Sequence, residues 1–143
     1  MDLHKSDVGG IGGLPSGVVQ RMSRSVLAPD ATHPITITPT DGRVVVRSGG
    51  TVIADTTNAL TLQESSYRAV QYVPLADVDP AVLRRTDHVT YCPYKGDASY
   101  YSVVANGSEV ANAVWEYQEP YEAVAPIKDH VAFYADKVSI DVS

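Results

Sequence analysis

From residue 35 onward, β-branched and aromatic residues alternate with polar residues in short runs. Alternation with a period of two predicts strands that bury one face and expose the other. The runs that follow this pattern are 35–39, 44–47, 51–54, 59–64, 69–74, 88–92, the two halves of 98–117, and 131–142. We therefore predict roughly seven to nine short strands in this part of the chain.

Turn signals separate several of these runs. Gly49-Gly50 lies between the second and third runs, and adjacent glycines readily adopt the positive φ that two-residue hairpin turns require. Asn106-Gly107 divides the run 98–117 in the same way and strongly predicts a second hairpin. The last run is expected to fold back on itself through residues 135–137.

One short helix is predicted near residues 80–85. Asp79 can accept hydrogen bonds from the free backbone N–H groups of a first turn, and Pro80 suits the first helical position. No segment predicts a helix long enough to connect two parallel strands, which argues against a parallel α/β fold. The expected fold is mainly β: a compact antiparallel two-sheet sandwich or a partly open barrel.

The first 34 residues differ from the rest of the chain. They contain five of the ten glycines, three prolines and no aromatic residue. We predict that residues 1–34 form a flexible amino-terminal arm, with one helical turn near residues 17–27, and that residues 35–143 form a single β domain. The segment Gly9–Gly17 is rich in glycine but lacks the Lys-Ser/Thr pair of a phosphate-binding loop, so it is interpreted as a linker.

Charge and composition exclude several classes of protein. Seventeen acidic and eleven basic residues give a net charge of −6, which disfavours nucleic-acid binding. No apolar run is long enough for a signal peptide or a membrane span, and the single cysteine precludes an internal disulfide and thiolate zinc sites. We expect a cytoplasmic protein without metal or cofactor. The free edges of the predicted sheets could pair with a second copy of the chain, so a homo-oligomer remains an alternative.

The stretch from Thr90 to Tyr101 concentrates reactive side chains. It holds Cys92, the only cysteine of the chain, and Lys95 three residues later, among four tyrosines. A thiol becomes a good nucleophile beside a cation or an imidazole, and Lys95 or His88 could supply one. A lone cysteine at the end of a strand is more often a small buried hydrophobic residue. Both interpretations stay open at this point.

Aromatic residues and one inward-facing carboxylate extend this candidate site. Trp115 and Tyr117 share one face of a predicted strand and either close the core or line a pocket. Glu64 is expected to face the interior, because the alternation continues from the two leucines before it. A buried glutamate needs a partner, and either Arg47 or Lys95 would provide one.

Other carboxylates are assigned structural or solvated positions. Glu116 alternates with its two aromatic neighbours and is predicted to lie on a solvated strand face. Asp77 and Asp79 form a D-x-D pair, but the expected helix start explains Asp79 as a cap and leaves Asp77 as a turn residue. Two-metal phosphoryl transfer is therefore poorly supported by these residues.

Several separated motifs, spread from His33 to Val142, resemble the domain-of-unknown-function family DUF427, which also carries a nucleotidyltransferase label. The residues that match are Cys92, Pro93, Lys95 and Gly96; Ala113, Trp115 and Tyr117; Tyr72, Pro74, Asp77 and Val78. The resemblance implies a compact antiparallel β domain, with a tent-like arrangement in which two small sheets meet at an angle. It implies no established reaction.

The leading functional hypothesis is a β domain that binds a small molecule in a pocket around the Cys-Pro-Tyr-Lys-Gly turn. The predicted ligand-binding residues are Tyr72, Tyr100, Trp115 and Tyr117. The enzymatic alternative takes Cys92 as nucleophile, Lys95 or His88 as its activator and Glu64 as proton acceptor. A nucleotidyltransferase, as the family label suggests, and a structural or interaction module are the remaining alternatives.

Overall fold

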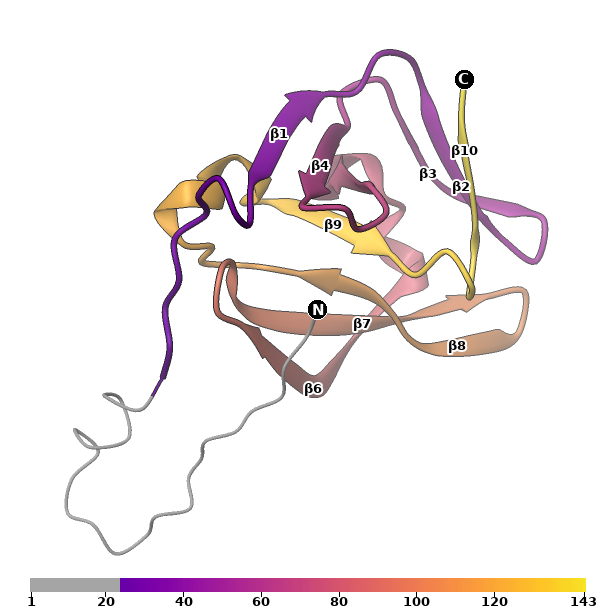
Figure 1. The fold of residues 1–143 in the computed structure, drawn as a ribbon. Coiled ribbons are helices and arrows are strands. Elements are labelled where there is room, and N and C mark those ends of the chain that lie inside the picture. The colour runs from indigo at the N-terminus through magenta and orange to yellow at the C-terminus, as the bar shows by residue number, and fades with distance from the viewer. Residues whose placement is uncertain (1–23) are drawn as a thin grey trace, which may run out of the picture.

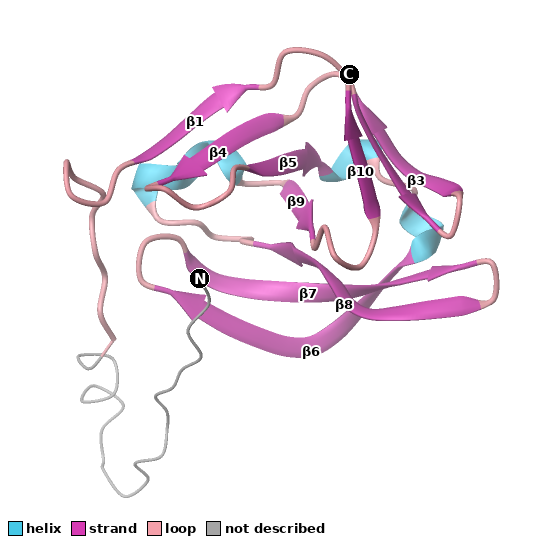
Figure 2. Cartoon of the chain, turned by 45° about the vertical axis from the view of Figure 1, so that its right-hand side comes forward, coloured by secondary structure: helices cyan, strands magenta, loops and turns pink. Residues whose placement is uncertain are grey.

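The computed structural model of the protein describes residues 24–143. Strands account for most of this part of the chain, and the helical segments are short 3-10 turns (Figure 2). The strands are β1 (Ile35–Pro39), β2 (Val44–Ser48), β3 (Thr51–Thr56), β4 (Leu60–Glu64), β5 (Val70–Pro74), β6 (Leu83–Cys92), β7 (Gly96–Ala105), β8 (Ser108–Glu116), β9 (His130–Phe133) and β10 (Ser139–Val142). The turns are η1 (Leu75–Asp77), η2 (Pro80–Val82) and η3 (Glu122–Ile127).

The strands form two antiparallel sheets. A seven-stranded sheet has the order β1-β4-β5-β9-β8-β7-β6, and a three-stranded sheet has the order β10-β2-β3 (Figure 1). Every pair of neighbouring strands is antiparallel. The large sheet ends at β1 and β6 and is not closed into a barrel. The predicted mainly β, two-sheet fold is confirmed.

The central part of the large sheet is buried on both faces. Neighbouring residues of one strand point to opposite faces, and Tyr72 and Val73 of β5 belong to two different hydrophobic clusters. We call the first cluster the inter-sheet core, because it combines both sheets: Val44, Val46, Ile53, Val73, Val114 and Phe133 are among its members. We call the second the outer core, which includes Leu62, Tyr72, Cys92, Tyr100, Tyr117 and Ile127.

Both predicted hairpins are present. Gly49 and Gly50 have φ of 57° and 86° and join β2 to β3. Asn106 and Gly107 have φ of 55° and 75° and join β7 to β8. Positive φ at both central residues is the requirement of a type I′ turn, so the local turn chemistry determined these connections.

The predicted helix after Asp79 is shorter than expected. Asp79 does accept a hydrogen bond from the backbone N–H of Ala81 at 3.0 Å, but the 3-10 turn η2 ends at Val82. Strand β6 begins at the next residue and pairs with β7 from Leu83 onward. The N-terminal signals were correct, and pairing with β7 stops the helix after one turn.

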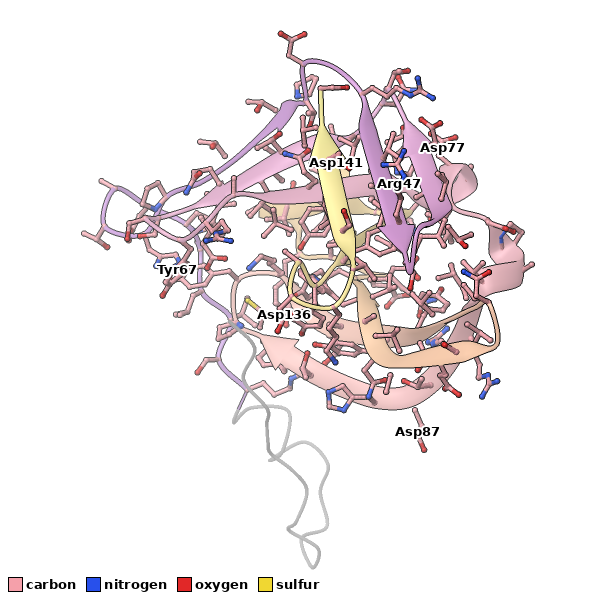
Figure 3. The ribbon with its side chains drawn as sticks, turned by 90° about the vertical axis from the view of Figure 1, so that its right-hand side faces the viewer. Arg47, Tyr67, Asp77, Asp87, Asp136 and Asp141 are labelled. Atoms are coloured by element: carbon pink, nitrogen blue, oxygen red, sulfur yellow. The ribbon has the colours of Figure 1, made fainter. Side chains whose placement is uncertain are left out.

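The C-terminal run does not fold back as a hairpin. β9 lies between β5 and β8 in the large sheet, whereas β10 pairs with β2 in the small sheet. An ion pair of 3.1 Å between Arg47 on β2 and Asp141 on β10 accompanies this pairing (Figure 3). The segment between β9 and β10 therefore links the two sheets.

The described part of the predicted arm contacts the β6–β7 turn. The backbone N–H of Leu27 donates to the carbonyl of Pro93 at 2.9 Å, and Arg24 forms an ion pair of 2.6 Å with Asp97. The Arg24 guanidinium also lies 3.9 Å from the ring centroid of Tyr91. The glycine-rich linker and most of the helical turn expected near residues 17–27 lie outside the described residues.

Candidate functional site

The turn between β6 and β7 positions Cys92 and Lys95. The backbone N–H of Lys95 donates to the Cys92 carbonyl at 3.2 Å, and Gly96 follows with φ of +112°. The Lys95 carbonyl accepts from the backbone N–H of Tyr121 at 3.0 Å. Glycine at position 96 permits this backbone, which other residues rarely adopt, and the Lys95 side chain is buried.

Lys95 and Glu64 form a buried ion pair. Lys95 Nζ lies 2.6 Å from Glu64 Oε1, and the two residues are only 5% and 6% exposed. Lys95 Nζ also donates to Cys92 Sγ at 3.5 Å. Of the two partners predicted for Glu64, the structure thus selects Lys95, while Arg47 pairs elsewhere.

His33 is a third member of this cluster that the sequence did not predict. Its Nε2 donates to Glu64 Oε2 at 2.7 Å, and its ring stacks on Tyr94 with centroids 4.1 Å apart. Burial by itself would raise the pKa of Glu64, but the hydrogen bonds from Lys95 and His33 hold it below its usual value. Glu64 is therefore a carboxylate with a hydrogen-bond donor on each oxygen.

A cavity of about 200 Å³ opens beside the ion pair. The side chains that line it come from β4, β5, β8 and the connections between strands: Leu62, Glu64, Tyr67, Arg68, Val70, Tyr72, Lys95, Trp115, Tyr117 and Tyr134. Five candidate residues of the sequence analysis are thereby brought together. Cys92 and Tyr100 are outside the lining and are buried in the outer core.

The rings of the cavity are held by contacts with one another. Trp115 Nε1 donates to the hydroxyl of Tyr72 at 3.2 Å, and the Trp115 and Tyr134 ring centroids are 4.5 Å apart. Behind them, the hydroxyl of Tyr100 lies 2.9 Å from Thr90 Oγ1 and 3.3 Å from the hydroxyl of Tyr134. This network holds Trp115 and its neighbours in defined positions, so the cavity wall is preorganised.

Comparison with known protein families identifies the family of the chain. The family model described as Domain of unknown function (DUF427) matches residues 36–143. The chain belongs to the DUF427 family. This confirms the resemblance inferred from the separated motifs. No curated protein matches the chain.

Within the described residues of this DUF427 chain, His88 forms no hydrogen bond with the Cys92 thiol. His88 lies where the register of β6 against β7 shifts, between Arg85 and Val89, and it is four residues along the strand from Cys92. His88 is exposed and meets the ring of Tyr100 edge-on at 4.5 Å. The cation that contacts the Cys92 sulfur is Lys95.

Glu116 was predicted on a solvated face, and that prediction is wrong. The residue is 3% exposed and accepts a hydrogen bond of 2.7 Å from the hydroxyl of Tyr101. Strand β8 lies between β7 and β9, and from Ala113 to Glu116 it is buried or half-buried, with a core on each face of the sheet, so Glu116 does not reach solvent. Burial, together with the hydrogen bond to Glu116, raises the pKa of Tyr101 to about 12.

The D-x-D pair has two structural roles. Asp77 accepts a hydrogen bond of 2.7 Å from Thr56 Oγ1, and Asp79 caps η2. Across residues 24–143, no three His, Cys, Asp or Glu side chains gather as metal ligands. The described residues therefore do not fit a two-metal transfer site. None of the helices in this range is long and apolar enough to cross a membrane.

Proposed function

We propose that this protein binds a small molecule in the cavity beside Lys95. The observation that carries the proposal is the buried Glu64–Lys95 ion pair at the wall of a cavity in which half of the lining residues are aromatic. Concave sites with apolar walls and a few fixed polar groups are the usual form of small-molecule sites.

Stability alone does not account for the ion pair. Replacing a buried ion pair by well-packed apolar residues is often neutral or stabilising, because desolvation of the two charges offsets their attraction. The ammonium group of Lys95 also has one N–H donor that its two partners do not use. An ammonium group has three N–H protons, and among the described residues Lys95 Nζ has two partners, Glu64 Oε1 and Cys92 Sγ. The third proton is available to an acceptor on a ligand.

The size of the cavity favours a compact ligand. An engineered apolar cavity of about 150 Å³ accepts one benzene ring. The present cavity, at about 200 Å³, therefore has room for one ring with a small substituent. Tyr72 and Trp115 provide flat walls for it.

Filling the cavity is expected to abolish binding. Val70 lines the cavity and is half-buried, so Val70→Phe places a ring in the space that the ligand would occupy. A library of single-ring metabolites should raise the melting temperature of the wild type and change the emission of Trp115, the only tryptophan of the chain. Neither effect should occur with Val70→Phe.

Val52→Phe is the matched control, because Val52 is exposed on β3 and lies outside the lining. This variant should respond to the library as the wild type does. If no compound changes the melting temperature or the emission of the wild type, the binding proposal is wrong.

A second candidate function uses Cys92 as a nucleophile. The 3.5 Å contact between Lys95 Nζ and Cys92 Sγ supports it, because a neighbouring ammonium group stabilises a thiolate. The burial of Cys92, which is 1% exposed and outside the cavity lining, favours the binding function.

Alkylation by iodoacetamide tests the nucleophile directly. We expect native Cys92 to react at least about a thousandfold more slowly than in the urea-unfolded chain, because a buried thiol reacts only when the protein opens. Mass spectrometry over a time course measures both rates. Rapid labelling of the native protein at neutral pH would contradict this expectation and favour the enzyme.

A further inference from the structure

The charges around the cavity do not cancel. Glu64 pairs with Lys95, and Arg68 adds a second cation to the lining. Two cations against one carboxylate leave the lining with one positive charge, although the chain as a whole carries −6. The cavity is thus a locally cationic site in an acidic protein.

Arg68 differs from the other arginines of residues 24–143. Each of the other arginines forms an ion pair or a hydrogen bond. The pairs are Arg24 with Asp97, Arg43 with Asp55, Arg47 with Asp141, Arg84 with Glu109, and Arg85 with Ser99 and Gln118. Within the same range, Arg68 has no such partner. Its guanidinium therefore presents all its donors to solvent and to the cavity that it lines.

The loop that carries Arg68 is held in place. Gln63 Nε2 donates to the carbonyls of Ser65 and Tyr67 at 3.1 and 2.6 Å, and the backbone N–H of Tyr67 donates to the Glu64 carbonyl at 2.9 Å. Tyr67 lies at the periphery of the molecule in Figure 3 and directly precedes Arg68. These hydrogen bonds fix the backbone immediately before Arg68, and the Arg68 side chain extends from this anchored loop to line the cavity.

From these observations we propose that the ligand is a small planar molecule with one aromatic ring and one negative charge, whose anionic group binds Arg68. A guanidinium presents a planar fork of donors that matches a carboxylate, and charged hydrogen bonds are stronger than neutral ones. Half of the lining residues are aromatic, which favours a flat ring over an aliphatic body. The inference rests on the proposed binding function and specifies its ligand class.

Three probes of similar size separate the charge from the ring. Benzoate carries both, benzamide has the ring without the charge, and cyclohexanecarboxylate has the charge without the ring. Titrations of the full chain, followed by Trp115 emission and by calorimetry, should show benzoate binding about tenfold more tightly than either of the other two.

The variant Arg68→Gln should remove the advantage of benzoate over benzamide and leave benzamide binding unchanged. Arg84→Gln is the matched control, because it removes the same charge from an exposed arginine outside the cavity. This control should retain the full preference for benzoate. A structural role for Arg68 would weaken all three probes together and would not change their order.

The outcomes distinguish the two proposals. If benzamide binds the wild type as tightly as benzoate, or if Arg68→Gln keeps the preference for benzoate, the ligand class is wrong and the binding function stands. If cyclohexanecarboxylate equals benzoate, the aromatic part of the inference is wrong. If no probe and no library compound binds, both proposals are wrong.

Discussion

Replacing Glu64 with leucine is expected to lower the free energy of unfolding by about 3–5 kcal/mol, because it leaves a buried ammonium group without its carboxylate. Glu64 is the central member of the cluster. Its two oxygens accept from Lys95 and from His33, so one substitution removes the partner of two donors. Urea denaturation of the wild type and the variant measures the difference.

The same geometry predicts an order among the related variants. Lys95→Met should lower the free energy of unfolding by less than Glu64→Leu does, because His33 still donates to Glu64 after the ammonium group is removed. The double variant, in which both charges are replaced by apolar side chains, should be more stable than Glu64→Leu alone. The surface pair between Arg43 and Asp55 is the control, and Asp55→Ala should cost less than about 1 kcal/mol because both side chains are exposed.

The contribution of Glu64 should also depend on pH. Its pKa in the folded protein lies below the usual 4.5, so the folded state binds fewer protons than the unfolded state as the pH falls through this range. The stabilisation is therefore complete above the usual pKa and is lost as the pH falls through the lower, folded value. The difference in stability between wild type and Glu64→Leu should be constant near neutral pH and shrink below about pH 4.5.

Two results would contradict this account of the cluster. A double variant less stable than Glu64→Leu would mean that the ion pair itself contributes a large net stabilisation. A difference between wild type and Glu64→Leu that does not change down to about pH 3 would mean that Glu64 is not an ionised hydrogen-bond acceptor in the folded protein.

Local signals in the sequence were sufficient for much of the fold. The turns at Gly49-Gly50 and Asn106-Gly107 depend on positive φ, a property of the residues themselves, and both formed as predicted. The path of the last strand depends instead on which sheet has a free edge. β2 offers that edge to β10, and no pattern within residues 131–142 specifies it.

The wrong prediction for Glu116 has a related cause. Alternation along one strand shows that its two faces differ, but it does not show what covers each face. The inter-sheet core and the outer core cover both faces of the large sheet around the C-terminal end of β8, so Glu116 meets Tyr101 and not water. Only the complete arrangement of the two sheets contains this information.

The candidate site was predictable in part. Alternation placed Glu64 inward, and of the two partners named for it, Arg47 and Lys95, the structure pairs it with Lys95. His33 was missed because its position depends on the register of β1 against β4, in which Ile35 lies opposite Glu64. Arg68 was missed because it lies in a connection between strands, where no periodicity indicates which way a side chain points.

Shortening Leu62 is expected to change both the stability of the protein and the size of the ligand that it prefers. Leu62 is fully buried in β4 and lines the cavity, so Leu62→Ala should lower the free energy of unfolding by about 2–5 kcal/mol. The volume that the side chain leaves adjoins the existing cavity. We therefore expect the variant to bind 2-naphthoate, which has two fused rings, more tightly than the wild type does, and to bind benzoate more weakly because fewer atoms contact the single ring.

Ile53→Ala separates the two effects, because Ile53 is equally buried but belongs to the inter-sheet core. It should lose a similar amount of stability, again about 2–5 kcal/mol, and keep the ring-size preference of the wild type. Urea denaturation and titration followed by Trp115 emission give the two readouts on the same samples. If Ile53→Ala changes the ring-size preference as much as Leu62→Ala does, this preference depends on the overall stability of the protein. The ligand then does not occupy the cavity that Leu62 lines.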